Sequence, residues 1–149
     1  MTPVTLLVVH AAATWFMTGL IWVVQVVHYP LFSYADRATY RAFAEAHGRL
    51  ISLIVGPAML VEAVTAAWLL VERPAVLPQR WAVAGLALVL VIWLSTALLQ
   101  VPLHAQLAHG YEARAHAWLV GSNWIRTLAW TARSAMVLVV LSRALERSS

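Results

Sequence analysis

Four long apolar stretches, each carrying a few polar residues, constrain this chain more than any other feature. They cover residues 4–27, 50–71, 81–103 and 118–141. An α-helix rises about 1.5 Å per residue, so each stretch is long enough to cross a hydrocarbon core about 30 Å thick. The sequence therefore predicts an all-α fold, a four-helix transmembrane bundle that forms a single integral membrane domain over residues 1–149.

The composition is typical of a protein embedded in the lipid bilayer. The 149 residues are 62% hydrophobic and 11% charged, unlike an ordinary soluble domain. All ten cations are arginines that lie at segment ends or inside the fourth stretch, so we expect no nucleic-acid partner. The absence of cysteine excludes disulfides and thiolate metal sites. We expect a multi-pass protein of the bacterial inner membrane.

The connections between the stretches give the predicted topology. The first helix should end near Tyr29, because a following proline disfavours helical backbone, and Pro102 should lie near the end of the third helix. Residues 36–47 are amphipathic, which is typical of an interfacial helix between the first two spans, or of an early start to the second. Four crossings put both termini on one side of the membrane, called side Y here; the first and third connections lie on the opposite side X. The positive-inside rule does not orient the chain, because each side has four arginines: Arg37, Arg41, Arg49 and Arg114 on X, and Arg73, Arg80, Arg143 and Arg147 on Y.

The polar residues inside the stretches recur at steps of three and four, which gives each helix one inward face. Most of them should gather near side X, where they would form one polar site: Gln25, His28, His47, Gln100, His104, Asn123 and Arg126. Deeper in the membrane lie two opposite charges, Glu62 and Arg133. An isolated arginine at this depth costs on the order of 3 kcal/mol, so we expect a buried pair. That pair has either a functional role or the structural one of fixing helix register.

Several chemistries fit the site near side X. His28, His47 and His104 are a candidate ligand set for zinc, copper or iron. The alternative is that these histidines bind no metal and are simply polar residues that lie in the headgroup layer. Haem is a second candidate cofactor, with His10 or His28 as axial ligand. Acid–base catalysis is a third, with the histidines moving protons and Arg126 holding a developing negative charge. Trp93 and Trp130 would supply flat walls for an apolar, aromatic or quinone-like molecule.

Two elements of the sequence resemble a known group. The run Val101-Pro-Leu-His104 and the later Asn123-Trp-Ile-Arg126-Thr127 are similar to small bacterial four-helix membrane proteins, most of them uncharacterised. The anthrone-oxygenase-like membrane proteins are the named members that the chain resembles, although they usually carry Asn where this chain has His104. The resemblance implies a four-helix membrane fold and oxygenation of a polycyclic anthrone. The spacing of His10, Trp15 and Gly19 is fainter in its likeness to haem-handling four-helix membrane proteins of the protoporphyrinogen-oxidase and copper-resistance types.

These observations lead to two hypotheses from different classes. The first is a membrane-embedded small-molecule-binding protein or oxidoreductase, whose catalytic residues would be His28, His47, His104 and Arg126. Its ligand-binding residues would be Gln25, Gln100, Asn123, Trp93 and Trp130. The alternative is a non-catalytic membrane subunit or a small transporter that forms a homo-oligomer and uses the polar stripe as a path. The sequence does not decide whether the protein is an enzyme.

Overall fold

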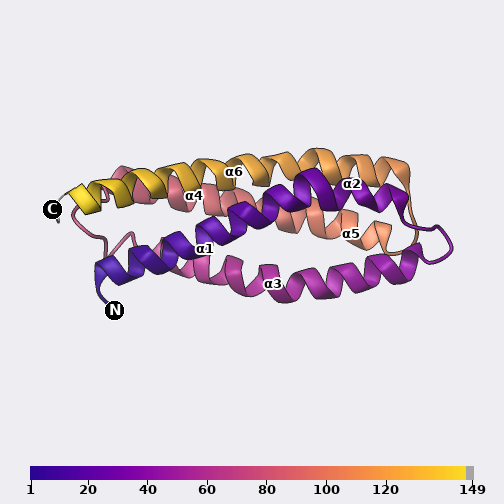
Figure 1. The fold of residues 1–149 in the computed structure, drawn as a ribbon, viewed down its shortest axis with the longest axis horizontal. Coiled ribbons are helices and arrows are strands. Elements are labelled where there is room, and N and C mark those ends of the chain that lie inside the picture. Colours follow the sequence, from indigo (N-terminus) through magenta and orange to yellow (C-terminus); the bar gives the residue numbers. More distant parts are fainter. Residues whose placement is uncertain (147–149) are drawn as a thin grey trace.

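The computed structural model describes residues 1–146 and consists of four long helices, each long and apolar enough to cross a membrane. Arg147, one of the arginines counted for side Y, lies outside the described residues. The helices run over Pro3–Tyr34, Tyr40–Trp68, Gln79–Leu107 and Ala113–Glu146. Figure 1 shows them side by side, with both termini at one end of the bundle. The prediction of an all-α four-helix bundle is confirmed, and the chain is a multi-pass integral membrane protein.

Two of the four helices change their hydrogen-bonding pattern on the way. The first comprises α1 (Pro3–Val23), a π-helical turn (Val24–His28), α2 (Tyr29–Leu31) and a 3₁₀ turn (Phe32–Tyr34). The third comprises α4 (Gln79–Ser95), a second π-helical turn (Thr96–Gln100) and α5 (Val101–Leu107). The second and fourth helices are single elements, α3 (Tyr40–Trp68) and α6 (Ala113–Glu146).

The prediction that proline ends the first helix at Tyr29 is wrong. The helix continues past Pro30 to Tyr34, and the third helix likewise continues past Pro102 to Leu107. A π-helical turn precedes each proline; in it the amide of Tyr29 donates to the Val24 carbonyl, and the amide of Val101 to that of Thr96. The wider turn lets the chain absorb the missing proline N–H without leaving the helix. Such turns are frequent at functional sites.

The amphipathic segment 36–47 is the start of α3 and not a separate interfacial helix. It enters α3 at Tyr40, so of the two alternatives the early start of the second helix is correct. Pro57 lies within α3, which then ends at Trp68.

The inward faces agree well with the prediction. The predicted polar residues of the site near side X and of the charge pair are all buried or half-buried, whereas many valine and leucine side chains between them are exposed where lipid would lie. Trp93 departs from this pattern, with 40% of its surface exposed. The seam between α1 and α6 is held by polar contacts: the hydroxyls of Thr18 and Ser134 are 2.6 Å apart, and Trp22 Nε1 donates to Thr131 Oγ1. Interhelical hydrogen bonds of this kind help helices associate in membranes.

Candidate functional site

The predicted pair of buried charges is present. It belongs to one of two polar clusters, called the lower cluster here because it lies nearer to side Y. Arg133 Nε donates to Glu62 Oε1 at 3.0 Å, and both side chains are about 2% exposed. The same carboxylate accepts from Thr14 Oγ1 and Trp130 Nε1, both at 2.8 Å. Glu62 therefore has a donor at each oxygen, which compensates for taking its charge out of water.

His10 completes this lower cluster and is held in one tautomer. Arg133 Nη2 lies 3.1 Å from His10 Nε2, and a guanidinium only donates, so Nε2 must be the acceptor. The ring proton is then on Nδ1, which faces Thr65 Oγ1 at 2.8 Å. Both ring nitrogens are engaged, so His10 offers neither to a haem iron. Arg133 also donates through Nη1 to the carbonyl of Gly85.

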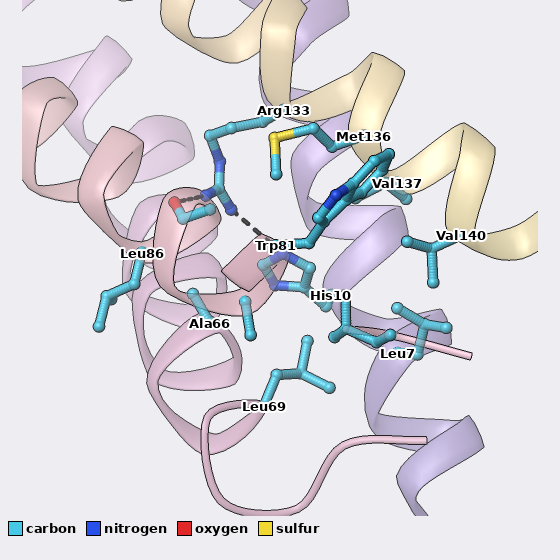
Figure 2. A pocket seen from close by; sticks show the side chains of 13 residues that line it. Leu7, His10, Ala66, Leu69, Trp81, Leu86, Arg133, Met136, Val137 and Val140 are labelled. Atoms are coloured by element: carbon cyan, nitrogen blue, oxygen red, sulfur yellow. Dashed lines mark hydrogen bonds between the residues drawn. The ribbon is translucent and has the colours of Figure 1, made fainter. Parts of the chain in front are cut away.

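A small cavity borders this lower cluster toward side Y. Figure 2 shows its walls of apolar side chains, with the Arg133 guanidinium and the His10 ring meeting at one side. Its volume is about 40 Å³, and the polar atoms beside it are already hydrogen-bonded to each other. The lower cluster thus joins side chains of α1, α3 and α6 with the Gly85 carbonyl of α4, and its main charges are satisfied within the protein.

The upper cluster, toward side X, surrounds a larger cavity of about 240 Å³. All four long helices line it. Its polar lining is Tyr29, Thr96, Gln100, His104, Arg126 and Ser52, and its apolar lining includes Met17, Met59, Trp93 and Trp130. Two lining positions on opposite sides of the gap between α3 and the third helix are open to the surroundings: Ser52 on α3 is exposed, and Val101 is 57% exposed. The exposed surface of these two lining residues indicates that the cavity opens sideways between α3 and the third helix, at a depth where lipid would lie.

Arg126 is the charged group of this cavity, and all of its hydrogen bonds go to neutral acceptors. Nε and Nη2 donate to Asn123 Oδ1 at 2.9 and 2.5 Å. Nη2 also donates to Tyr29 Oη, and Nη1 to Thr96 Oγ1, both at 3.3 Å. Nη1 carries a second hydrogen, for which the described residues provide no acceptor.

No carboxylate in the described part of the chain pairs with Arg126. The ion pairs among residues 1–146 are Arg41–Glu45 and Arg133–Glu62. Yet Arg126 is 6% exposed and lies roughly 20 Å along α6 from its side X end, within the apolar part of the span. A buried cation without a counter-charge is costly in a membrane and is a functional candidate by default.

Gln25 and Asn123 hold Arg126 in place and do not line the cavity. Asn123 Nδ2 donates to Gln25 Oε1 at 2.8 Å, which turns the oxygen of Asn123 toward Arg126. Gln25 Nε2 in turn donates to the carbonyl of Val120 at 3.2 Å. These two predicted ligand-binding residues are therefore supports for the guanidinium.

Gln100, by contrast, lines the cavity and has an unused acceptor. Its Nε2 donates to Ser122 Oγ at 2.9 Å, and the Ser122 hydroxyl donates on to the carbonyl of Trp118. Gln100 Oε1 is buried and has no hydrogen-bond partner within residues 1–146. A buried polar atom left this way calls for a partner from a ligand or a water molecule.

The predicted histidines gather between the cavity and side X. His104 lines the cavity, and its Nε2 lies 2.9 Å from Tyr29 Oη. His28 Nε2 and His47 Nδ1 are 2.9 Å apart, and the rings of His47 and His104 have centroids 5.2 Å apart. The three rings thus lie together, as the sequence predicted.

The same three histidines do not form a ligand set for a metal. Within the described residues, no group of three or more His, Cys, Asp or Glu side chains is arranged to hold a metal ion. His28 and His47 use one nitrogen each on the other, and His104 Nε2 faces Tyr29. In this arrangement the three histidines therefore do not fit a shared metal ion.

The two predicted tryptophan walls differ in character. Trp130 is fully buried and links the two clusters, because its ring lines the cavity while its Nε1 donates to Glu62. Arg126 lies over the same indole, with 6.0 Å from its Cζ to the ring centroid. Trp93 lines the cavity at its outer edge, where the ring is also exposed.

Three contributors to the site are not among its predicted residues. Tyr29 connects Arg126 and His104, whereas the sequence indicates only that it precedes a proline. Thr96, the first residue of the second π-helical turn, accepts a hydrogen bond from Arg126 Nη1. His116 lies in α6, and its Nε2 is 2.8 Å from the Tyr29 carbonyl. The position of Tyr29, four residues after Gln25, was the available signal for the first of these.

Comparison of the chain with protein-family models, curated proteins and solved structures finds no match. The assignment of function therefore depends on the geometry of the site.

Proposed function

We propose that this protein binds a membrane-dissolved amphipathic acid, with the anionic oxygen of the ligand at Arg126 and its apolar part in the upper cavity. The observation that carries the proposal is the guanidinium of Arg126, buried, without a carboxylate partner and with one N–H open. An anion there would form a charge-assisted hydrogen bond in a low-dielectric setting, where such bonds are strongest.

The walls of the cavity suit the apolar part of such a ligand. Met17, Met59 and the indole of Trp130 offer an apolar and partly aromatic surface, and Met side chains adapt to varied shapes. The sideways opening between Ser52 and Val101 would let a tail extend into the bilayer. Entry from the membrane also explains why a site in this span needs no route through water.

The remaining polar groups would orient the head of the ligand. Gln100 Oε1 is free to accept a hydrogen bond from the head or from a water molecule beside it. Tyr29 Oη and His104 complete the polar end of the cavity. The rest of the lining is apolar, which is the usual composition of a small-molecule site.

The test is binding of decanoate labelled with ¹³C at its carboxyl, to the protein in lipid nanodiscs. We expect a carboxyl resonance that empty nanodiscs lack and that Arg126→Gln loses. Decanol, which has the same tail and no charge, should compete at least tenfold less well than unlabelled decanoate. A wild-type protein without the resonance contradicts the proposal, and equal competition by decanol or by a short-chain benzoquinone shows that the charge of Arg126 does not select the ligand.

Other aspects of function stay predictions. These are redox chemistry at the same site, transport along the polar stripe by a homo-oligomer, the likeness to anthrone-oxygenase-like proteins and a bacterial inner membrane as the setting.

A further inference from the structure

The histidines beyond the cavity carry an inference that rests on the proposed function. We propose that Tyr29, His104, His47 and His28 form a proton path from the head of the bound ligand to side X. An acid dissolved in a bilayer is uncharged, but beside Arg126 its anion is favoured. Binding from the membrane therefore releases a proton, which needs a way out of the apolar span.

The first step of the path has a fixed direction. Arg126 Nη2 donates to Tyr29 Oη, so the Tyr29 hydroxyl is free to donate to His104 Nε2, 2.9 Å away. His104 then accepts on Nε2 and holds its own proton on Nδ1. Because both Tyr29 and His104 line the cavity, the head of a ligand at Arg126 is next to the start of this chain.

The second step depends on an unusual atom. His47 Nε2 is buried and has no hydrogen-bond partner within residues 1–146. The neighbouring ring is that of His104, with a centroid separation of 5.2 Å. The path requires His104 Nδ1 to reach this acceptor, through rotation of either ring or through one bridging water molecule. A buried nitrogen without a partner is costly in a purely structural cluster. A nitrogen that accepts a proton during transfer, however, must have its lone pair free.

The last step leads outward. His47 Nδ1 lies 2.9 Å from His28 Nε2, and His28 is half-buried. The first helix is 32 residues long, about 48 Å, and His28 lies about 9 Å from its side X end at Tyr34. Centred on a hydrocarbon core about 30 Å thick, the helix puts His28 at the core boundary, where water is available.

The proton balance of one transfer is simple. The O–H bond of the acid breaks, its proton passes to Tyr29 Oη, and the Tyr29 proton passes to His104 Nε2. His104 gives its Nδ1 proton to His47 Nε2, and His47 gives its Nδ1 proton to His28 Nε2. His28 releases its Nδ1 proton at side X. The ligand remains as the anion at Arg126, and each imidazole is neutral with its proton on the other nitrogen.

The charged and titratable groups around the path are few. Arg126 on α6 faces Tyr29, and His116 on α6 is bonded to the Tyr29 carbonyl. The apolar ring of Phe32 packs beside the path, with its centroid 4.9 Å from that of His47 and 6.4 Å from that of His116. No carboxylate of the described residues is bonded to these histidines, so none holds a proton in the path.

The test measures proton release and ligand binding separately. Decanoic acid is mixed with the protein in nanodiscs in weak buffer, and a pH dye follows release while the carboxyl resonance reports binding. We expect His47→Gln and His28→Gln to bind decanoate as the wild type does but to release the proton at least tenfold more slowly. Added imidazole should restore the rate, which a merely structural defect would not allow. His109→Gln, an exposed histidine outside the path, is the matched control.

The outcomes distinguish the two proposals. If the wild type binds no decanoate, the proposed function fails. If both glutamine variants bind normally and release the proton as fast as the wild type, the path is overturned and the binding site stands. A slow variant that imidazole leaves unchanged also counts against the path.

Discussion

At the residue scale, the two buried arginines of α6 have different roles, although they are seven positions apart on one helix face. Arg133 meets Glu62 and has its charge neutralised inside the protein. Arg126 meets the amide oxygen of Asn123, which hydrogen-bonds but leaves the charge uncompensated. Because residue 123 is asparagine and not aspartate, Arg126 has no counter-charge from its main hydrogen-bond partner. Its cation therefore stays available to a ligand.

Asn123→Asp tests this difference directly. The new carboxylate would pair with Arg126 at the distances that the amide now has, and the amide of Gln25 would have to turn to donate to it. We expect a higher melting temperature in detergent and at least tenfold weaker decanoate binding, because an internal charge-assisted pair competes with the ligand. Thermal melts and the carboxyl resonance measure the two effects. Unchanged affinity in a stable variant would be inconsistent with Arg126 acting as the anion site.

Residue patterns predicted much of this arrangement, for a physical reason. Helical periodicity fixes which residues share a face, so the gathering of Arg126, His104 and Gln100 was predictable from spacing. Periodicity does not tell whether a side chain lines a cavity or supports its neighbour, so it predicts ligand contacts for Gln25 and Asn123, which in the structure support Arg126. That distinction depends on hydrogen bonds between helices.

At the element scale, the site depends on two π-helical turns that the sequence did not reveal. Each lies just before a proline, and each carries one of the two buried glutamines, Gln25 and Gln100. The rule that proline ends a helix predicted a break at Tyr29 and failed, because a widened turn can accommodate the ring. The continuation of the helix is what brings Tyr29 and His104 to the cavity.

The opening beside α3 gives a prediction for Gly56, which lines the cavity. A Cβ built at Gly56 meets no atom within 4 Å, so a larger side chain has room to enter. We expect Gly56→Leu to weaken decanoate binding at least tenfold by filling the opening. Leucine is favoured over glycine within a helix by up to about 1 kcal/mol, but Pro57 disfavours helical backbone at a preceding residue that has a Cβ. Circular dichroism of the variant must therefore match the wild type before its affinity is compared.

Gly121→Leu is the matched control for this filling experiment. Gly121 lies in α6, is exposed, does not line the cavity and also has no atom near its built Cβ. It should keep wild-type affinity. Equal affinity of the Gly56 and Gly121 variants would show that the ligand does not use this cavity.

At the scale of the whole molecule, the lower cluster fixes the four helices relative to one another. His10 comes from α1, Glu62 from α3, Gly85 from α4 and Arg133 from α6, and hydrogen bonds join them across the centre of the bundle. The satisfied bonding of these charges favours the register role over a functional one.

A double-mutant cycle tests the register role. Arg133→Gln or Glu62→Gln alone should destabilise the protein by about 3–5 kcal/mol, because each leaves a buried charge unpaired. The double variant should recover part of that loss, which thermal unfolding in detergent measures. If the effects of the two single changes simply add, the two residues are not energetically coupled.

The position of Trp130 limits how the protein can be redesigned to bind another ligand. Its indole is at once part of the chamber wall and the only side chain seen to satisfy the second oxygen of Glu62 among residues 1–146. Trimming it to enlarge the chamber would also loosen the tie between the helices. A redesign must therefore keep this ring, or supply Glu62 with another hydrogen-bond donor before the chamber is enlarged.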